Sequence, residues 1–226
     1  MKSRFSKLYI FLLSLSFFVL IFLVPRSYGI SNNIINKIEA RYQNIYSIKA
    51  NFYQKENISG YSQNMIFKGR FYYKRNNHSD NAWGMTWVYE YPFHKRQVLK
   101  NNRLYIINNL IKKVTIINVG KERGGFPPNV VQVIGSLTKY FNVKNIHRNK
   151  ASGDIILELK PIAMQRAKKI YVGFASNNLK IKSLKIITHQ GQIINFIYKN
   201  VKFNMPIDGS VFNINFPSYY RIIKEN

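Results

Sequence analysis

The sequence predicts a mainly β protein of the α+β class, in which one antiparallel sheet is strongly curved on itself and covered by short helices. Short runs with period-2 alternation of apolar and polar residues recur along the chain, separated by tight-turn residues. A helical segment precedes these strands, and a second helical stretch interrupts them. Two helical pieces with apolar faces therefore remain to cover the open, concave side of the sheet.

The first 29 residues are typical of an export signal. Met1–Lys7 carries three positive charges, Leu8–Val24 is almost purely apolar, and Ser27-Tyr28-Gly29 offers small residues at the −3 and −1 positions of a cleavage site. A retained membrane anchor is the alternative, because an apolar run of 17 residues reaches the short end of a spanning helix. The favoured organisation is a signal peptide over 1–29 and a single domain over 30–226 that works outside the cytoplasm.

The chain is strongly basic. Its formal net charge of +26 at pH 7 falls to +22 when residues 1–29 are removed. The charges are scattered over strands and turns without a compact Lys/Arg block, and the abundance of Lys, Asn, Ile, Tyr and Phe is typical of an AT-rich coding bias. We therefore expect no specific nucleic-acid binding, whereas incidental attraction to anionic lipid headgroups stays open. The absence of cysteine excludes disulfides and a lipid-modified N-terminal cysteine.

The first predicted element is a helix over Ser31–Tyr46 with Ser31 as its cap. Its apolar stripe comprises Ile34, Ile35, Ile38, Tyr42 and Ile45. A strand over Gln63–Lys74 follows, in which alternate residues share one face: Met65, Phe67, Gly69, Phe71 and Tyr73. The other face of this strand, which includes Tyr72, is expected to be wet.

Four short strands are predicted next, with turns at Asn101-Asn102 and Asn108-Asn109. They cover Met85–Tyr91, Arg96–Lys100, Arg103–Ile107 and Lys112–Asn118. Pro127-Pro128 then opens Asn129–Phe141, whose apolar spacing predicts one or two short helices split by Gly135. Strands resume over Asp154–Lys160, Lys168–Ala175, Ile181–His189, Gln192–Lys199 and Val211–Phe216.

Residues for catalysis are poorly represented. The nine acidic residues form no convincing pair for general acid/base work, and no cysteine nucleophile or Gly-x-Ser-x-Gly elbow exists. The four histidines are far apart and lack metal-ligand spacing. Gly120–Gly125 resembles a phosphate loop only superficially, because the terminal Lys-Ser/Thr is missing. We therefore expect no catalytic residue, no metal and no cofactor, and the protein is not expected to be an enzyme.

The chain is unusually rich in aromatic and branched apolar residues. Sixteen Phe, sixteen Tyr and two Trp make up 15% of the chain, and the strand over Gln192–Lys199 is apolar on both faces. Ordinary core explains any single one of these residues. Their number together favours an apolar cavity between the sheet and its helices.

Five short motifs occur one after another along the chain. Ser47–Lys55 directly follows the amphipathic helix, Gly69–Arg75 ends in arginine, and Thr86–Pro92 contains Trp-x-Tyr-x-x-Pro. Asn101–Ile106 is a turn followed by Leu-Tyr, and Gly209–Pro217 contains Phe-x-Phe-x-x-Pro. In this order the motifs resemble those of the periplasmic outer-membrane lipoprotein carrier family, the LolA family, over almost the whole chain after residue 29.

The resemblance implies an unclosed antiparallel β-barrel with a helical lid. Such a protein sequesters the acyl chains of lipoproteins in its hollow and transfers them through the periplasm. The implied partners are an inner-membrane lipoprotein-releasing ABC transporter and an outer-membrane lipoprotein acceptor, with the carrier itself a monomer. Two further hypotheses stay open: a LolA-like paralogue that carries another lipid or glycolipid, and an anchored envelope protein that uses the same fold to sense or scaffold.

Strand alternation and the family pattern together predict the site. The cavity lining is expected to comprise Phe52, Phe67, Phe71, Met85, Trp87, Tyr89 and Ile106. The lid is expected to present Ile34, Ile38, Val133 and Leu137. The family's lid-latching arginine corresponds to Arg75 when counted from Gly69, but to Asn81 when counted back from Trp87, because Asn76–Ala82 lengthens this loop and lacks the family's proline.

Overall fold

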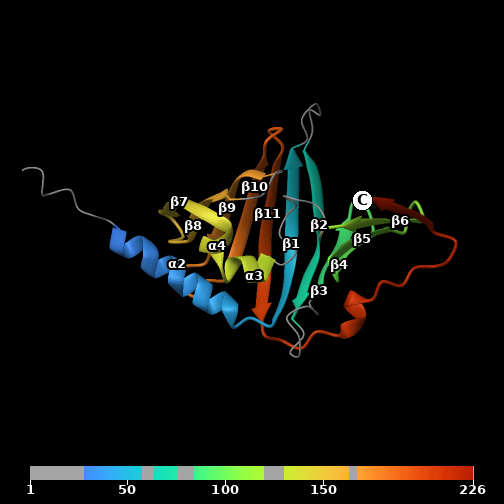
Figure 1. The fold of residues 1–226 in the computed structure, drawn as a ribbon, viewed down its shortest axis with the longest axis horizontal. Coiled ribbons are helices and arrows are strands. Elements are labelled where there is room, and N and C mark those ends of the chain that lie inside the picture. Colours follow the sequence, from blue (N-terminus) through green and yellow to red (C-terminus); the bar gives the residue numbers. More distant parts are fainter. Residues whose placement is uncertain (1–27, 58–63, 76–83, 120–129, 163–166, 226) are drawn as a thin grey trace, which may run out of the picture. The chain divides into compact units, whose positions relative to one another are not determined.

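A computed structural model describes residues 28–57, 64–75, 84–119, 130–162 and 167–225 (Figure 1). The chain divides into two compact units, Met1–Asn36 and Lys37–Asn226. Nearly all of the predicted signal peptide or anchor lies outside the described residues. Within the described part of the chain, no helix combines the length and apolar character needed to cross a membrane.

One twelve-stranded sheet dominates the second unit, in the order β12-β6-β5-β4-β3-β2-β1-β11-β10-β9-β8-β7. Its strands are β1 (Ser47–Asn57), β2 (Met65–Lys74), β3 (Gly84–Tyr91), β4 (Lys95–Lys100), β5 (Arg103–Asn108), β6 (Lys113–Asn118), β7 (Phe141–Arg148), β8 (Ile155–Pro161), β9 (Ala167–Phe174), β10 (Ile181–Thr188), β11 (Ile193–Phe203) and β12 (Arg221–Glu225). Every neighbouring pair is antiparallel except β12 and β6, which are parallel. The two edge strands β7 and β12 do not pair, so the curved sheet is unclosed, and the predicted fold class is confirmed.

Two meanders build this sheet. The first runs from β1 to β6 and the second from β7 to β11, and pairing of β1 with β11 joins them. A tight turn connects β4 and β5, as predicted at Asn101 and Asn102, whose φ angles of 51° and 57° fit an asparagine turn. Figure 1 shows the joined strands β1 and β11 at the middle of the sheet.

In the described part of the chain, three helices and a 3₁₀ turn accompany the sheet: α2 (Tyr28–Gln43), α3 (Val130–Ile134), α4 (Leu137–Tyr140) and η2 (Gly209–Phe212). The predicted split at Gly135 is confirmed, because this residue separates α3 from α4. The predicted bounds of the first helix were shifted: Ser31 lies inside α2 and is not its cap, and the helix ends at Gln43.

The C-terminal part differs most from the sequence prediction. The strand expected over Val211–Phe216 is wrong: its first residues form the 3₁₀ turn η2, and the rest has no sheet partner. Phe212 packs in a buried cluster with Ile207 and Tyr72. Tyr72 was expected on a wet face, but this returning segment buries it. The prediction also missed β7 and β12.

The two faces of the sheet are different. Ile48, Ala50 and Phe71 lie on a face that we call the lid face, because Val131 and Ile134 of α3 pack against it. The opposite face, here called the open face, carries Tyr53 and Ile197 among its residues. The lid face holds the predicted site.

Candidate functional site: the lid face of the sheet

Strand register brings all the predicted cavity residues to the lid face. Phe71 of β2 pairs with Trp87 of β3, and Trp87 in turn pairs with Gln97, which is opposite Ile106. The seven residues that share this face are Phe52, Phe67, Phe71, Met85, Trp87, Tyr89 and Ile106. The first four and Tyr89 are buried, whereas Trp87 and Ile106 are partly exposed. Their role in binding stays a prediction.

Their rings form a continuous aromatic surface. The ring centroids of Phe52 and Tyr89 are 5.1 Å apart, and those of Phe71 and Trp87 are 5.3 Å apart. Gly69 makes room for this surface, because a Cβ there would lie 2.0 Å from the carbonyl oxygen of Val88 and 3.0 Å from the ring of Phe52. Edge-to-face and tilted arrangements of this kind stabilise packed aromatic clusters.

Two members of this surface were missed by the sequence prediction. Phe196 and Tyr198 of β11 stack with a centroid distance of 6.0 Å. Phe196 lies 6.1 Å from Phe52, and Tyr198 lies 6.1 Å from Phe71. Alternation along β11 put them on one face, but nothing local distinguished that face from the one carrying Ile197.

Tyr42 anchors the end of α2 to the sheet. Its ring meets those of Phe174 and Phe203 edge-on, at 5.8 and 5.6 Å. Its hydroxyl donates to the carbonyl of Leu179 at 3.2 Å and accepts from the backbone N–H of Ile181 at 2.9 Å. Burial raises the pKa of Tyr42 well above its ordinary value, so the hydroxyl keeps the proton that it donates.

Polar bonds join the helical pieces to one another. The side-chain amide of Gln43 donates to the carbonyl of Gly135 at 2.9 Å. The carboxylate of Glu39 accepts from the backbone N–H of Thr138 at 3.0 Å and from its hydroxyl at 3.1 Å. The last turn of α2 is thus bonded to the junction of α3 and α4, and these pieces form one lid.

Three of the four predicted lid residues are buried in this unit. Ile38, Val133 and Leu137 are each at most 5% exposed. Ile34 belongs to the first compact unit, so its predicted role stays a prediction. A small hollow of about 10 Å³ lies between α3 and the sheet, with Tyr42, Ala50, Phe71 and Tyr198 in its lining. That is about the room of one water molecule, so α3 packs closely against this part of the sheet.

Arg75 follows β2 and contacts the end of α2. Its Nη1 donates to the carbonyl oxygen of Gln43 at 3.2 Å, and its Nε lies 3.4 Å from the hydroxyl of Tyr73. Its backbone N–H donates to the carbonyl of Tyr46 at 2.8 Å. The guanidinium therefore reaches a carbonyl at the helix C-terminus, where a cation is favoured. Asn81, the alternative position for a latch, lies outside the described residues.

A polar group borders the aromatic surface. The Tyr89 hydroxyl donates to Oε1 of buried Gln54 at 3.1 Å, and the amide of Gln54 donates to Glu56. Nζ of Lys95 lies 4.4 Å from the ring centroid of Tyr89 and 5.1 Å from that of Phe67. Burial lowers the pKa of Lys95, opposed by the charge of Glu56. In the described part of the chain, no carboxylate pairs with this ammonium group.

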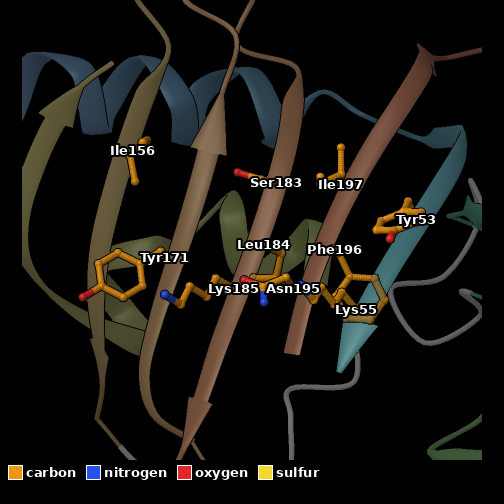
Figure 2. Close-up of a pocket in the computed structure, with 10 residues that line it drawn as sticks. All are labelled: Tyr53, Lys55, Ile156, Tyr171, Ser183, Leu184, Lys185, Asn195, Phe196 and Ile197. Carbon is orange, nitrogen blue, oxygen red and sulfur yellow. The ribbon is translucent and has the colours of Figure 1, made fainter. Parts of the chain in front are cut away.

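The larger hollows lie on the open face. A groove of about 510 Å³ runs across β8–β11 and β1 (Figure 2). A second hollow of about 870 Å³ shares Tyr53 and Ile197 with it. Lysines border both, including Lys55, Lys185 and Lys199. The hollow between α3 and the lid face, at about 10 Å³, is much smaller than either of these. The apolar cavity under the lid stays a prediction. Among the described residues, no cluster of His, Asp or Glu could hold a metal ion.

The architecture defines a class of protein: an unclosed antiparallel sheet with one apolar face under a helical lid. The sequence model of the outer membrane lipoprotein carrier protein LolA family matches residues 43–215. The chain therefore belongs to the LolA family. An outer-membrane lipoprotein carrier protein of Francisella tularensis subsp. novicida (strain U112) is 25% identical over 211 residues, covering 92% of this chain and 95% of the relative.

Solved structures support the fold alone. A DUF1329 family protein from Desulfovibrio piger ATCC 29098 matches with a TM-score of 0.52 at 9% identity, over 80% of this chain and 97% of its own. An uncharacterized conserved protein from Thermus thermophilus matches with a TM-score of 0.50 at 8% identity, over 86% of this chain and 99% of its own. The same fold thus occurs in proteins with little sequence in common.

Proposed function

We propose that this protein carries lipoproteins through the periplasm with their acyl chains held between the lid face and the lid. It would receive them from an inner-membrane lipoprotein-releasing ABC transporter and hand them to an outer-membrane acceptor. The observation that carries the proposal is the continuous aromatic face from Phe67 and Tyr89 to Tyr198, part of which lies against α3. Membership of a family of lipoprotein carriers supports it.

Acyl chains need such a shelter in water. Each buried CH₂ group contributes about 0.8 kcal/mol, so a lipid-modified protein does not cross an aqueous space unaided. The hollow of about 10 Å³ between α3 and the sheet is far too small for an acyl chain, so a chain held there requires α3 to move. The bonds of Gln43 and Glu39 within the lid, and the bond of Arg75 to the lid, are each worth roughly 0.5–3 kcal/mol net. Cargo that binds only the open form can offset an opening cost of this size.

Arg75 suits the role of lid latch in this scheme. It lies at the end of β2 and bonds the C-terminal carbonyl of Gln43, so it can favour the closed lid without contacting the acyl chains. The closed state then includes the bond from the Arg75 guanidinium to Gln43, and the open state lacks it. Release at the acceptor would follow from closure rather than from a fuel carried by the protein.

The test is direct observation of cargo. Native mass spectrometry of protein isolated from the cell envelope should reveal a bound triacyl lipoprotein. In a Trp83→Phe background, Trp87 is the single tryptophan, and its fluorescence should change when an acyl ligand is added. A protein that carries no acylated species and whose Trp87 emission ignores acyl ligands would contradict the proposal.

A LolA-like carrier of another lipid is the second candidate. The observation in its favour is Lys95, an ammonium group without a carboxylate partner among the described residues, held over two rings of the aromatic surface. Such a cation suits an anionic lipid headgroup better than a neutral one. Free anionic lipid, in place of lipoprotein, in the same mass spectra would favour this candidate.

A further inference from the structure

The tip of the β5–β6 hairpin presents large apolar side chains to solvent. Leu110 is 69% exposed and Ile111 is 60% exposed. With Tyr219, which is 67% exposed, they are the three most exposed large apolar residues in the part of the chain that the structure describes. We call these three residues the apolar tip. An isolated exposed apolar residue is ordinary, but two adjacent aliphatic residues at a hairpin turn beside an exposed tyrosine form a local patch.

The turn is braced so that this exposure is fixed. Oδ1 of Asn108 accepts from the backbone N–H groups of Leu110 and Ile111, at 3.1 and 3.4 Å. The hydroxyl of Tyr220 donates to Oδ1 of Asn109 at 3.2 Å, from a segment far along the chain. This hydrogen bond connects the hairpin to the C-terminal segment and supports the turn in which Leu110 and Ile111 are exposed.

The surroundings of the apolar tip are cationic. Nζ of Lys112 lies 5.5 Å from the ring centroid of Tyr219, and Lys113 pairs with Arg221 in the parallel register of β6 and β12. The sequence from 91 to 121 contains no Asp or Glu, and neither does that from 209 to 224. Among the described residues, no carboxylate forms an ion pair with Lys112, Lys113 or Arg221, the cations around the tip.

We propose that the apolar tip docks this protein reversibly on the surface of an anionic phospholipid bilayer. The aliphatic pair would enter the acyl boundary, the tyrosine would lie at headgroup depth, and the cations would contact lipid phosphates. The small size of the tip favours a bilayer over a protein partner, because stable protein interfaces need roughly 1,000 Å² or more. A single short apolar element gives marginal, reversible attachment, which lets the protein leave again. This inference goes beyond the proposed function and does not depend on what the lid face holds.

Vesicle co-sedimentation of the natively processed protein tests the proposal. We expect binding to vesicles of phosphatidylglycerol and phosphatidylethanolamine, and much weaker binding to phosphatidylcholine alone. The double variant L110S/I111S should reduce the partition coefficient at least about tenfold, since buried apolar area drives insertion. K112Q should reduce it about fivefold, with a smaller response to added salt. The matched controls are M205S, at an exposed apolar site elsewhere, and K150Q, at the β7–β8 turn; both should bind like the wild type.

Several results would overturn the proposal. If L110S/I111S partitioned like the wild type, the apolar tip would not take part in membrane binding. If K150Q lost as much binding as K112Q, the general positive charge of the protein, and not the tip, would explain the binding. Sedimentation velocity showing a wild-type dimer that L110S/I111S disrupts, without vesicle binding, would make the tip an interface between copies. Binding only to vesicles that contain envelope proteins would indicate a protein partner. Acyl-ligand binding is expected to be unchanged in L110S/I111S, so failure here is distinguishable from failure of the proposed function.

Discussion

Tyr42 ties the end of α2 to the sheet through its hydroxyl. This group both donates and accepts in a buried position, so Tyr42→Phe leaves the N–H of Ile181 and the carbonyl of Leu179 without this partner. We expect the free energy of unfolding to fall by about 1–3 kcal/mol, the usual cost of an unsatisfied buried group. Denaturant melts followed by circular dichroism measure it. Tyr46→Phe, which removes a solvent-exposed hydrogen bond to the carbonyl of Asn204, serves as the control, and equal effects of the two changes would contradict the anchoring role.

Arg75 is predicted to act on release rather than on uptake. Arg75→Leu removes the bond to the Gln43 carbonyl, which shifts the open–closed balance of the lid about tenfold or more. Uptake of acyl ligand should be kept, with an affinity that rises by up to the same factor because cargo binds the open form, whereas cargo transfer to an acceptor should become slower. Arg75→Lys keeps the positive charge but lacks the planar guanidinium group, so its transfer rate should lie between those of the wild type and Arg75→Leu. Transfer at the wild-type rate in Arg75→Leu would end the latch hypothesis for this residue.

At the scale of elements, the lid should open when a charge is placed under it. Ile38→Glu and Val133→Glu put a carboxylate against an apolar surface, which costs several kcal/mol unless the lid lifts. We expect weaker acyl binding while the far-ultraviolet spectrum of the sheet is kept. Lys37→Glu, on the exposed side of the helix that carries Ile38, is the control. Unchanged binding in both buried variants would mean that these helices do not cover the site.

A disulfide should fix the helical pieces of the lid to one another. A Cβ built on Gly135 lies 3.4 Å from Cγ of Gln43, and the chain contains no other cysteine to compete. In Gln43→Cys/Gly135→Cys, oxidation should reduce loading of acyl ligand, because α2 can no longer separate from α3 and α4, and reduction should restore it. Each single variant under oxidising conditions is the control. Equal loading of the oxidised and reduced double variant would show that cargo enters without separating these pieces.

Local sequence patterns predicted most of the elements and the composition of the lid face. Alternation in β2 assigned Phe67 and Phe71 to one face because side-chain direction along a strand is a local property. The fate of Tyr72 was not local, since residues more than a hundred positions away return to bury it. Phe196 and Tyr198 were missed for a similar reason: both faces of β11 are apolar, and only its register with β1, which contains a bulge, decides which is covered.

At the scale of the whole molecule, β12 protects an edge of the sheet. It pairs with β6 from Lys113 to Ile117, so β12 covers backbone groups of that strand that would otherwise be free. Deleting 219–226 should leave the sheet folded but make the protein aggregate at lower concentration. Light scattering against concentration checks this, with Ile222→Ser, an exposed position of the same strand, as the control. Identical scattering of the truncated and complete chains would contradict an edge-protecting role.

The seam between β1 and β11 has a consequence for how the chain acquires its structure. Each meander consists of neighbours in sequence and can form early, but Phe52 must wait for Tyr198 before the two halves join. While the chain emerges from its N-terminus, β1 therefore keeps one unpaired edge until nearly the whole sequence is available. When the chain appears from its N-terminus onward, the first meander thus stays exposed at its β1 edge, where another chain can pair, until β11 is available. The yield of folded protein then depends on whether β11 pairs with β1 faster than the exposed edge of β1 pairs with another chain. The free energy of the folded state matters less.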